Sequence, residues 1–358
     1  MTTDEKYMSR CIQLARNGFY GAAPNPMVGA VIVHDGKIIG EGYHVRCGGP
    51  HAEVNAVRSV CNPELLKEST IYVSLEPCSH YGKTPPCADL IVEKGIPRVV
   101  VGCMDPFAKV AGRGIRKLQE AGIEVTVGVL EAECLALNRR FITFHTHRRP
   151  YITLKWAESA DGFMDSQRTD YEKEKPYAFS TPYTRMLVHR CRAEHQAILV
   201  GRQTALADNP SLNLRMWPGK SPLRLVMDRR GDLPGHLALF NDGTETRVYL
   251  DVLSVLPPYG KQAGVTCVHL DFSRDILPQI LDDLYRLSVQ SLLVEGGHRL
   301  LESFISAGLW DEIRVEQSPV FLKEGIPSPS WPHGRIRTTE VEGHLLVHIL
   351  SSRVSSAV

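Results

Sequence analysis

Four residues in three segments form the set of side chains best suited to chemistry in this sequence. His51 and Glu53 stand in the segment His-Ala-Glu, and Cys78 and Cys87 each follow a proline. One imidazole and two thiolates supply three of the four ligands of tetrahedral zinc, which leaves one position open to water. Glu53 lies on the same first helical turn as His51 and can reach that water without binding the metal. The pattern therefore predicts a catalytic zinc site in which Glu53 relays protons.

Three predicted elements must bring these side chains together. The sequence predicts a helix from His51 (HAEVNAVRSV), a strand over 71–75 that ends before Glu-Pro-Cys, and a second helix from Cys87 (CADLIVEKG). The positive ends of two helix dipoles at one site favour thiolates, the form that zinc binds. For any single member, a simpler alternative is a capped helix with a satisfied histidine and two buried thiols. The joint pattern favours zinc.

The rest of the first half has the pattern of an α/β domain. The apolar runs 31–33 and 38–39 flank a His-Asp-Gly-Lys turn whose two central residues tolerate positive φ, so an antiparallel hairpin is predicted. Further strands over 98–102 and 123–128 alternate with helical patterns. This alternation predicts a sheet covered by helices in a three-layer sandwich.

The length of 358 residues accommodates two domains, each large enough for its own core. A polar, basic junction ends at Pro150, after which a strand pattern starts again. We therefore predict one domain over 1–145, a linker over 146–150 and a second domain over 151–358.

Charge and cysteine content exclude several classes of protein. The chain has 41 basic and 40 acidic residues, a net charge of +1, so we expect no nucleic-acid partner. No apolar run approaches the roughly 18 residues of a membrane span, and no secretory signal is evident, so we expect a cytoplasmic protein without a membrane partner. The 9 cysteines are odd in number and are expected to be free thiols or metal ligands.

The zinc pattern resembles that of the zinc-dependent cytidine and nucleobase deaminase superfamily. The shared motifs are His-Ala-Glu at 51–53 and the two Pro-Cys pairs at 77–87, although an eight-residue loop separates the cysteines here where C-x-x-C is common. The longer loop is similar to that of the deaminase half of bifunctional riboflavin biosynthesis proteins. The segments that carry this likeness are PNPMVGAVIV (24–33), GEGYH (40–44), HAEVNAV (51–57), LEPCSHYGKTPPC (75–87) and DP…KVAGRGI (105–115).

The resemblance implies further substrate contacts in this half. It implies Asn25 beside the pyrimidine, His44 against the substrate, His80 and Lys83 at the ribose phosphate, and Asp105 at the ribose hydroxyls. The residues alone leave simpler alternatives open. These are a turn for Asn25, a surface or core position for His44, solvated loop polarity for His80 and Lys83, and a turn cap for Asp105.

The second half also alternates strand and helix patterns, and it contains one informative turn. A buried strand over 291–295 leads into Gly296-Gly297 and a helix from His298. Glycines at such a turn let a phosphate approach the backbone, and the helix N-terminus supplies positive potential. Because the segment is not G-x-G-x-x-G, phosphate binding and a plain tight turn both stay open. The overall pattern predicts a second doubly wound α/β domain.

Five blocks of the second half are similar to the reductase half of the same riboflavin proteins, whose fold resembles dihydrofolate reductase. They are RPYITLKWAESADG (149–162), FSTPYTRMLVHRCRAEHQAILVG (179–201), TALADNPSLNLR (204–215), PLRLVMD (222–228) and VEGGHRLLESFISAGLWDE (294–312). The match implies NADPH contacts for Ala157, Thr204, Asp208, Gly296 and Gly297, and substrate contacts for Lys155, Arg192, Leu212, Arg215 and Glu295. Arg229 is a candidate for the 2′-phosphate of NADPH.

From the residues themselves, the guanidiniums of Arg192 and Arg215 suit a phosphate in fork geometry, with solvation at the surface as the alternative. Asp208, before Asn-Pro, also suits a simple turn.

The resemblance implies a cytidine-deaminase-like α/β/α domain followed by a dihydrofolate-reductase-like α/β domain. The first would use Zn²⁺ to deaminate a pyrimidine ribosylamino phosphate, and the second would use NADPH to reduce the ribosyl group to ribityl. We expect a homo-oligomer with this small-molecule substrate. One rival is a deaminase whose second half binds RNA, which the near-neutral charge of that half disfavours. Another is a zinc-stabilised scaffold that would release no ammonia.

Overall fold

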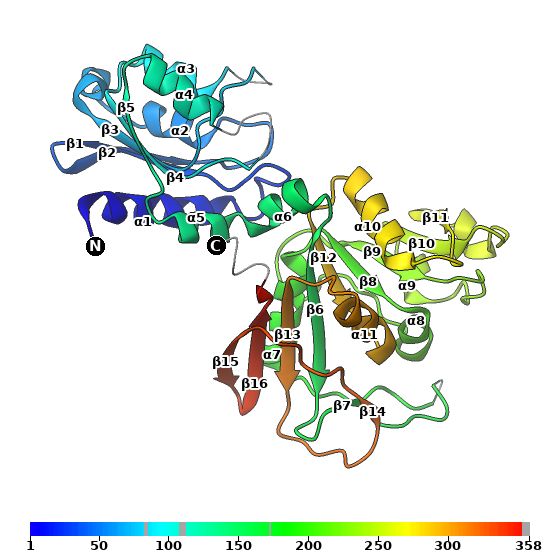
Figure 1. Cartoon of the computed structure of the whole chain (residues 1–358). Helices are drawn as coiled ribbons and strands as arrows, with labels where there is room; N and C mark the ends of the chain where they lie inside the picture. Colours follow the sequence, from blue (N-terminus) through cyan, green and yellow to red (C-terminus); the bar gives the residue numbers. More distant parts are fainter. Residues whose placement is uncertain (82–84, 107–111, 172, 353–358) are drawn as a thin grey trace. The chain divides into compact units, whose positions relative to one another are not determined.

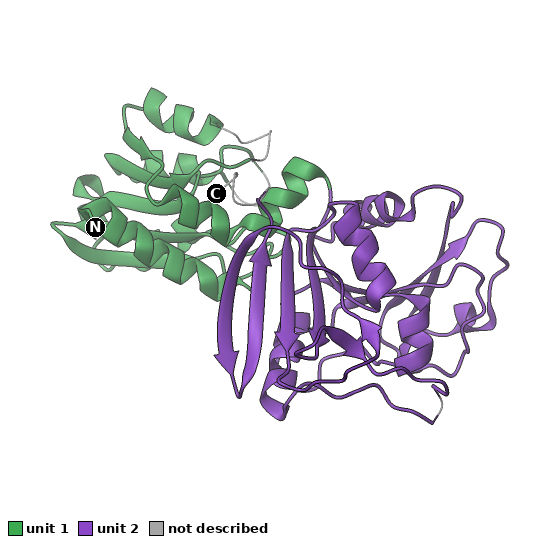
Figure 2. Cartoon of the chain, turned by 60° about the horizontal axis from the view of Figure 1, so that its bottom comes forward, with its two compact units in different colours: residues 1–148, 357–358 green, residues 149–356 purple. Residues whose placement is uncertain are grey.

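The computed structural model describes residues 1–81, 85–106, 112–171 and 173–352, which fold into two compact units (Figure 2). The first unit runs from Met1 to Arg148, and the second begins at Arg149. The last helix of the first unit, α6 (Arg139–His147), reaches into the segment 146–150. Within the described ranges, no helix is long and apolar enough to cross a membrane.

The first unit is built on a five-stranded sheet in the order β2-β1-β3-β4-β5 (Figure 1). The predicted antiparallel hairpin is confirmed, and Asp35 and Gly36 at its turn have positive φ. β3, β4 and β5 run parallel, so that their carboxyl ends lie at one edge. The strands are β1 (Gly29–His34), β2 (Lys37–Tyr43), β3 (Thr70–Leu75), β4 (Arg98–Cys103) and β5 (Glu124–Val127).

Helices cover both faces of this sheet, so the predicted three-layer sandwich is confirmed. Ala56, Ile91 and Leu118 from α2, α3 and α4 are fully buried against one face, and Met8 and Cys11 from α1 against the other. The helices are α1 (Thr3–Ala15), η1 (Arg16–Gly18), α2 (Ala52–Arg58), η2 (Pro63–Glu68), α3 (Cys87–Glu93), α4 (Arg113–Glu120), α5 (Glu131–Leu137) and α6.

The second unit contains a nine-stranded sheet in the order β11-β10-β9-β8-β12-β6-β13-β16-β15. Neighbours from β11 to β13 are parallel, whereas β16 pairs antiparallel with both β13 and β15. β7 and β14 form a separate antiparallel two-stranded sheet. The strands are β6 (Tyr151–Glu158), β7 (Phe163–Asp165), β8 (Ala197–Val200), β9 (Leu223–Met227), β10 (Thr246–Asp251), β11 (Val265–Leu270), β12 (Ser291–Glu295), β13 (Glu312–Gln317), β14 (Ile326–Pro327), β15 (Arg335–Val341) and β16 (His344–Leu350).

The helices of the second unit pack on both faces of its sheet. Ile280 of α10 and Phe304 of α11 lie in the apolar cluster of one face, and Cys191 of α7 and Ala205 of α8 lie in that of the other. Because β8, β9 and β12 run parallel, their carboxyl ends lie at one edge of the sheet. The helices are α7 (Pro182–Ala193), α8 (Arg202–Asp208), α9 (Ala238–Asn241), η3 (Pro258–Lys261), α10 (Ile276–Arg286) and α11 (His298–Ser306).

Candidate active sites

The three predicted metal ligands lie together at the carboxyl edge of the first sheet. His51 is the N-cap residue of α2, Cys78 follows β3, and Cys87 is the first residue of α3. His51 Nδ1 lies 3.5 Å from Cys78 Sγ and 3.3 Å from Cys87 Sγ. The ligand atoms of all three side chains fall within 4.8 Å of one another.

These distances fit a zinc ion. Bonds of about 2.3 Å to sulfur and about 2.0 Å to nitrogen place the two atoms about 3.5 Å apart around a tetrahedral ion. The backbone N–H of Cys87 donates to Cys78 Sγ at 3.3 Å, a contact that also suits a thiolate. The chemistry of the donor set and its spacing are therefore those of a three-ligand zinc site.

Glu53 lies beside this ligand set. It is 3% exposed and stands in the first turn of α2, two residues after His51. Burial, with the charge of Cys78 adding to it, raises the pKa of Glu53 to about 7. A buried carboxyl group beside the ligand set is in place to accept and return protons.

His44 and Asn25 extend the site on the side of His51. The His44 ring is 2% exposed and meets the His51 ring edge-on, with 5.3 Å between centroids. His44 Nδ1 lies 3.0 Å from the carbonyl oxygen of Pro50, which can only accept, so this nitrogen donates. Nε2 of the neutral ring then accepts from Asn25 Nδ2 at 3.1 Å. Asn25 and His44, which are 19 positions apart in the sequence, are therefore hydrogen-bonded to each other, and His44 packs against the metal ligand His51.

Glu76 is a buried carboxylate next to the ligand set to which the sequence pattern assigned no role. Its carboxylate is 4% exposed and accepts backbone N–H groups of Gly112 and Gly114 at 2.9 Å each, and that of Asp105 at 3.3 Å. A Cβ on Gly114 would lie 2.0 Å from the Pro77 carbonyl oxygen, so this approach requires glycine. Glu76 therefore ties the segment before Cys78 to the start of α4. Its place in Glu-Pro-Cys was visible in the sequence, but its partners were not.

The remaining predicted residues of the first unit have different settings. Asp105 is buried, and its backbone N–H is one of those that donate to Glu76, whereas His80 is exposed. Lys83 lies outside the described residues.

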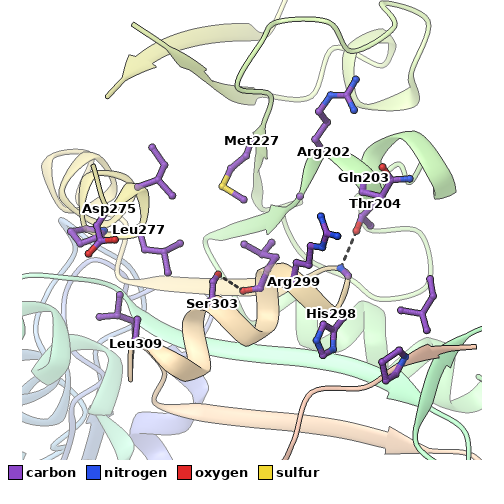
Figure 3. A pocket seen from close by; sticks show the side chains of 18 of the residues that line it. Arg202, Gln203, Thr204, Met227, Asp275, Leu277, His298, Arg299, Ser303 and Leu309 are labelled. Atoms are coloured by element: carbon purple, nitrogen blue, oxygen red, sulfur yellow. Dashed lines mark hydrogen bonds between the residues drawn. The ribbon is translucent and has the colours of Figure 1, made fainter. Parts of the chain in front are cut away.

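A cavity of about 1150 Å³ lies at the carboxyl ends of β8, β9 and β12 in the second unit (Figure 3). Arg202, Thr204 and Arg299 gather at one end of it, and Leu277 and Leu309 lie at the other. The cavity therefore has a cationic end that suits phosphate groups and a second end where Leu277 and Leu309 lie beside Asp275.

Gly297 forms the turn predicted to face a phosphate. It is the N-cap residue of α11, has no side chain to cap the helix, and lines the cavity. Its backbone N–H donates to Thr204 Oγ1 at 3.0 Å, which joins two predicted cofactor residues across 93 positions. Arg299, two residues further along the chain in α11, also lines the cavity. The sequence pattern did not identify it, although it lies in the segment 294–312 that resembles the reductase.

Three predicted substrate residues meet where β6 and β12 run side by side. Lys155 and Glu295 are direct neighbours in the strand register. Arg192 of α7 holds Glu295 through two hydrogen bonds, Nε to Oε1 at 3.2 Å and Nη2 to Oε2 at 2.7 Å. Against the effect of burial, the Arg192 charge lowers the pKa of Glu295. Arg192, Glu295 and Lys155 therefore form one cluster of charged side chains from α7, β12 and β6.

The segment between α8 and β9 carries the other two predicted substrate residues. Leu212 is buried and has a φ of 52°, a left-handed conformation that is unusual for leucine. Arg215 is exposed, and its backbone N–H donates to His189 Nδ1 at 3.3 Å. The structure therefore places Arg215 beside α7, the helix of Arg192.

Four other residues were predicted to contact the cofactor, and two of them are engaged in ion pairs. Asp208 accepts from Arg168 Nη2 at 2.6 Å, and Arg229 pairs with Asp251 at 3.1 Å. Neither lines the cavity, whereas Tyr171 does. Ala157 lies half-buried on β6, two residues after Lys155, and Gly296 precedes the turn. The predicted role of Arg229 at the 2′-phosphate stays a prediction.

Comparisons with known proteins match both units. Residues 1–103 match the cytidine and deoxycytidylate deaminase zinc-binding region, and residues 150–337 match the RibD C-terminal domain. The riboflavin biosynthesis protein RibD of Aquifex aeolicus (strain VF5) is 40% identical over 325 residues, 90% of this chain and 89% of that protein. RibD of Escherichia coli (strain K12) is 37% identical over 342 residues, 89% of this chain and 88% of that protein.

A solved structure has the same architecture. The crystal structure of a diaminohydroxyphosphoribosylaminopyrimidine deaminase/5-amino-6-(5-phosphoribosylamino)uracil reductase from Thermotoga maritima superposes with a TM-score of 0.85 at 36% identity. The match covers 98% of this chain and 99% of that one.

The folds and the zinc ligand set define a protein that joins a cytidine-deaminase-like domain to a dihydrofolate-reductase-like domain. Its cofactors are zinc in the first and NADPH in the second. The chain belongs to the RibD family of bifunctional riboflavin biosynthesis proteins. The family resemblance and the fold class inferred from the sequence are confirmed.

Proposed function

We propose that the first domain removes the pyrimidine amine of diaminohydroxyphosphoribosylaminopyrimidine by hydrolysis, the reaction in the name of the Thermotoga maritima protein. The observation that carries this proposal is the set of His51, Cys78 and Cys87 ligand atoms within 4.8 Å, with buried Glu53 beside it. When bound, zinc supplies the positive charge that makes a water molecule acidic enough to act as a nucleophile near neutral pH.

The residues of this chain then have separate tasks. Glu53 takes a proton from the attacking water and delivers it to the ring nitrogen, and it then carries the remaining hydroxyl proton to the departing amine, so that ammonia leaves and a ring carbonyl remains. Asn25, held by the neutral His44 ring, presents its amide to the pyrimidine edge. His80, Lys83 and Asp105 are assigned to the ribose phosphate end.

Ammonia release from three compounds tests this proposal: the phosphorylated diaminopyrimidine, its dephosphorylated form and cytidine. We expect release from the first, much slower release from the second and none from cytidine. Release from cytidine at a rate equal to that of the first compound would contradict the proposed substrate class.

We further propose that the second domain reduces the ribosyl group of the deaminated product to ribityl. NADPH supplies the hydride when it occupies the cavity at Gly297 and Thr204. Lys155, Glu295 and Arg192 face the substrate beside that cavity, and Arg215 and Arg192 bind its phosphate. Ala157, Asp208 and Gly296 are assigned to the cofactor side, and Leu212 to the substrate.

The organisation of the chain follows the same proposal. Residues 1–145 form the deaminase domain, 146–150 the linker and 151–358 the reductase domain. We propose a homo-oligomer that works in the cytoplasm on this small-molecule substrate, without a nucleic-acid or membrane partner.

Replacing Arg215 with Ala is expected to raise KM for the deaminated pyrimidine phosphate about tenfold, because one charge-assisted contact with the phosphate is lost. KM for the dephosphorylated compound should not change. Arg192→Ala is a less clean test, since it also leaves Glu295 without its partner. Arg274→Ala, an exposed arginine paired with Asp271, is the control. An unchanged KM in Arg215→Ala would remove Arg215 from the phosphate site.

A bulky side chain at Gly297 is expected to weaken NADPH binding by at least about tenfold, because it would fill the place of the cofactor phosphates. Gly297→Trp and Gly297→Ala form a matched pair, since a Cβ here would lie at an ordinary 3.5 Å from Thr204 Oγ1. Titration of NADPH fluorescence gives both affinities. If the Trp variant binds NADPH as tightly as the Ala variant, the cofactor phosphates lie elsewhere.

A further inference from the structure

His189 is a buried polar residue that the proposed mechanism does not use. It lies in α7 one turn before Arg192, and only 3% of it is exposed. Positions three apart on a helix share a face, so His189 looks toward the same side as Arg192. A histidine in that place needs a partner for its ring nitrogens or a task at the site.

The partner of His189 is the backbone of the Arg215 segment. The Arg215 N–H donates to His189 Nδ1 at 3.3 Å, which leaves the ring proton of the neutral form on Nε2. Burial, followed by the charges of Arg192 and Arg215, lowers the pKa of His189 and keeps the ring neutral. A neutral ring is required here, because a protonated Nδ1 could not accept.

The segment around Arg215 belongs to neither a helix nor a strand, and it lies along α7. The Trp217 ring lies 5.6 Å from the Arg190 guanidinium carbon, and a Cβ on Gly219 would lie 3.4 Å from the Ala193 Cβ. The first is a contact between two side chains and the second is a close approach of the Gly219 backbone to Ala193, and neither is a directional hydrogen bond. The hydrogen bond at His189 is directional, and it acts on the backbone of the residue whose guanidinium is assigned to the phosphate.

Arg192 is fixed by a different partner. Arg192 stands one turn after His189 in α7, and its guanidinium donates two hydrogen bonds to Glu295 of β12. The two proposed phosphate-binding arginines are therefore placed by two separate groups. Glu295 holds Arg192 through its side chain. Arg215 is held by His189 through its main chain, and its Nη1 donates to Asn213 Oδ1 at 2.5 Å within the same segment.

We propose that His189 is a positioning residue of the reductase site, which holds the Arg215 segment against α7 so that Arg192 and Arg215 converge on one substrate phosphate. The inference rests on the proposed function of the second domain. It assigns to His189 no contact with substrate, and its effect passes through Arg215. Small displacements of a binding group lower its contribution strongly, so the loss of this hydrogen bond should be visible in substrate binding.

The test uses three variants of the full chain with its cofactors. His189→Asn places an amide oxygen near the position of Nδ1 and can still accept from Arg215. His189→Leu removes the acceptor at similar volume. His269→Leu, at an exposed histidine of β11, is the matched control.

We expect His189→Leu to raise KM for the deaminated pyrimidine phosphate about tenfold, with kcat, the Kd for NADPH and Tm near those of the parent protein. His189→Asn and His269→Leu should keep the parent KM. In the Arg215→Ala background, His189→Leu should add no further rise, because the residue it positions is gone. Ribose 5-phosphate, titrated calorimetrically, should show the same ranking of affinities.

The outcomes distinguish a failure of the proposed phosphate site from a failure of the role proposed for His189. If the parent protein does not prefer the phosphorylated substrate, the proposed phosphate site fails. If it does, and His189→Leu leaves KM unchanged or His189→Asn is as impaired as His189→Leu, the role of His189 is overturned. An additive rise in the double variant would also contradict action through Arg215.

Discussion

Glu53→Gln is expected to abolish most deaminase activity while the protein keeps its zinc. The substitution preserves size and hydrogen-bonding capacity but removes the group that accepts and returns protons. General acid–base groups contribute on the order of 10²-fold to 10⁴-fold, so ammonia release should fall by at least about 10²-fold. The buried position of Glu53 next to the ligand set means that no other described side chain of the first helical turn can replace it.

Three controls make this result specific. Zinc content measured by mass spectrometry should match the parent protein. NADPH oxidation with the already deaminated substrate should continue, since the reductase site is in the other domain. Glu64→Gln, at an exposed carboxylate paired with Lys67, should keep full deaminase activity. Ammonia release near the parent rate in Glu53→Gln would exclude Glu53 as the proton relay.

Cys78→Ser and Cys87→Ser are each expected to lose zinc and deamination together. A three-ligand site that loses one thiolate retains two protein ligands, and its affinity should fall by far more than tenfold. Metal analysis after dialysis against a weak chelator gives the occupancy. Cys61→Ser, at an exposed free cysteine, should retain the metal and is the matched control. Near-full occupancy in both ligand variants would contradict the assignment.

The grouping of His51, Cys78 and Cys87 was predictable because these residues are identified by residue type and local context. His51 and Glu53 share a helical turn, and each cysteine sits at the end of a strand or the start of a helix. The hairpin at Asp35 and Gly36 was predictable for a similar reason, since a two-residue turn has a strong local signature.

The contacts that could not be predicted are those between residues far apart in the sequence. The partners of Glu76 lie about 30 to 40 positions further along the chain, and Arg215 meets His189 across 26 positions. The hairpin of β15 and β16 was also missed, although Glu342 and Gly343 form a turn with positive φ. β15 is exposed along nearly its whole length, so its residues show no alternation of apolar and polar positions.

The most direct measurement of the central claim follows both reactions in the purified full chain with phosphorylated diaminopyrimidine as the one starting substrate. We predict one ammonia released and one NADPH oxidised per substrate, with ammonia release continuing when NADPH is withheld and NADPH oxidation absent until deamination has occurred. In Glu53→Gln both signals should fall together, and the deaminated substrate should restore NADPH oxidation alone. Ammonia release without any NADPH oxidation, or neither signal from a fully zinc-loaded protein, would contradict the assignment of two successive reactions to this chain.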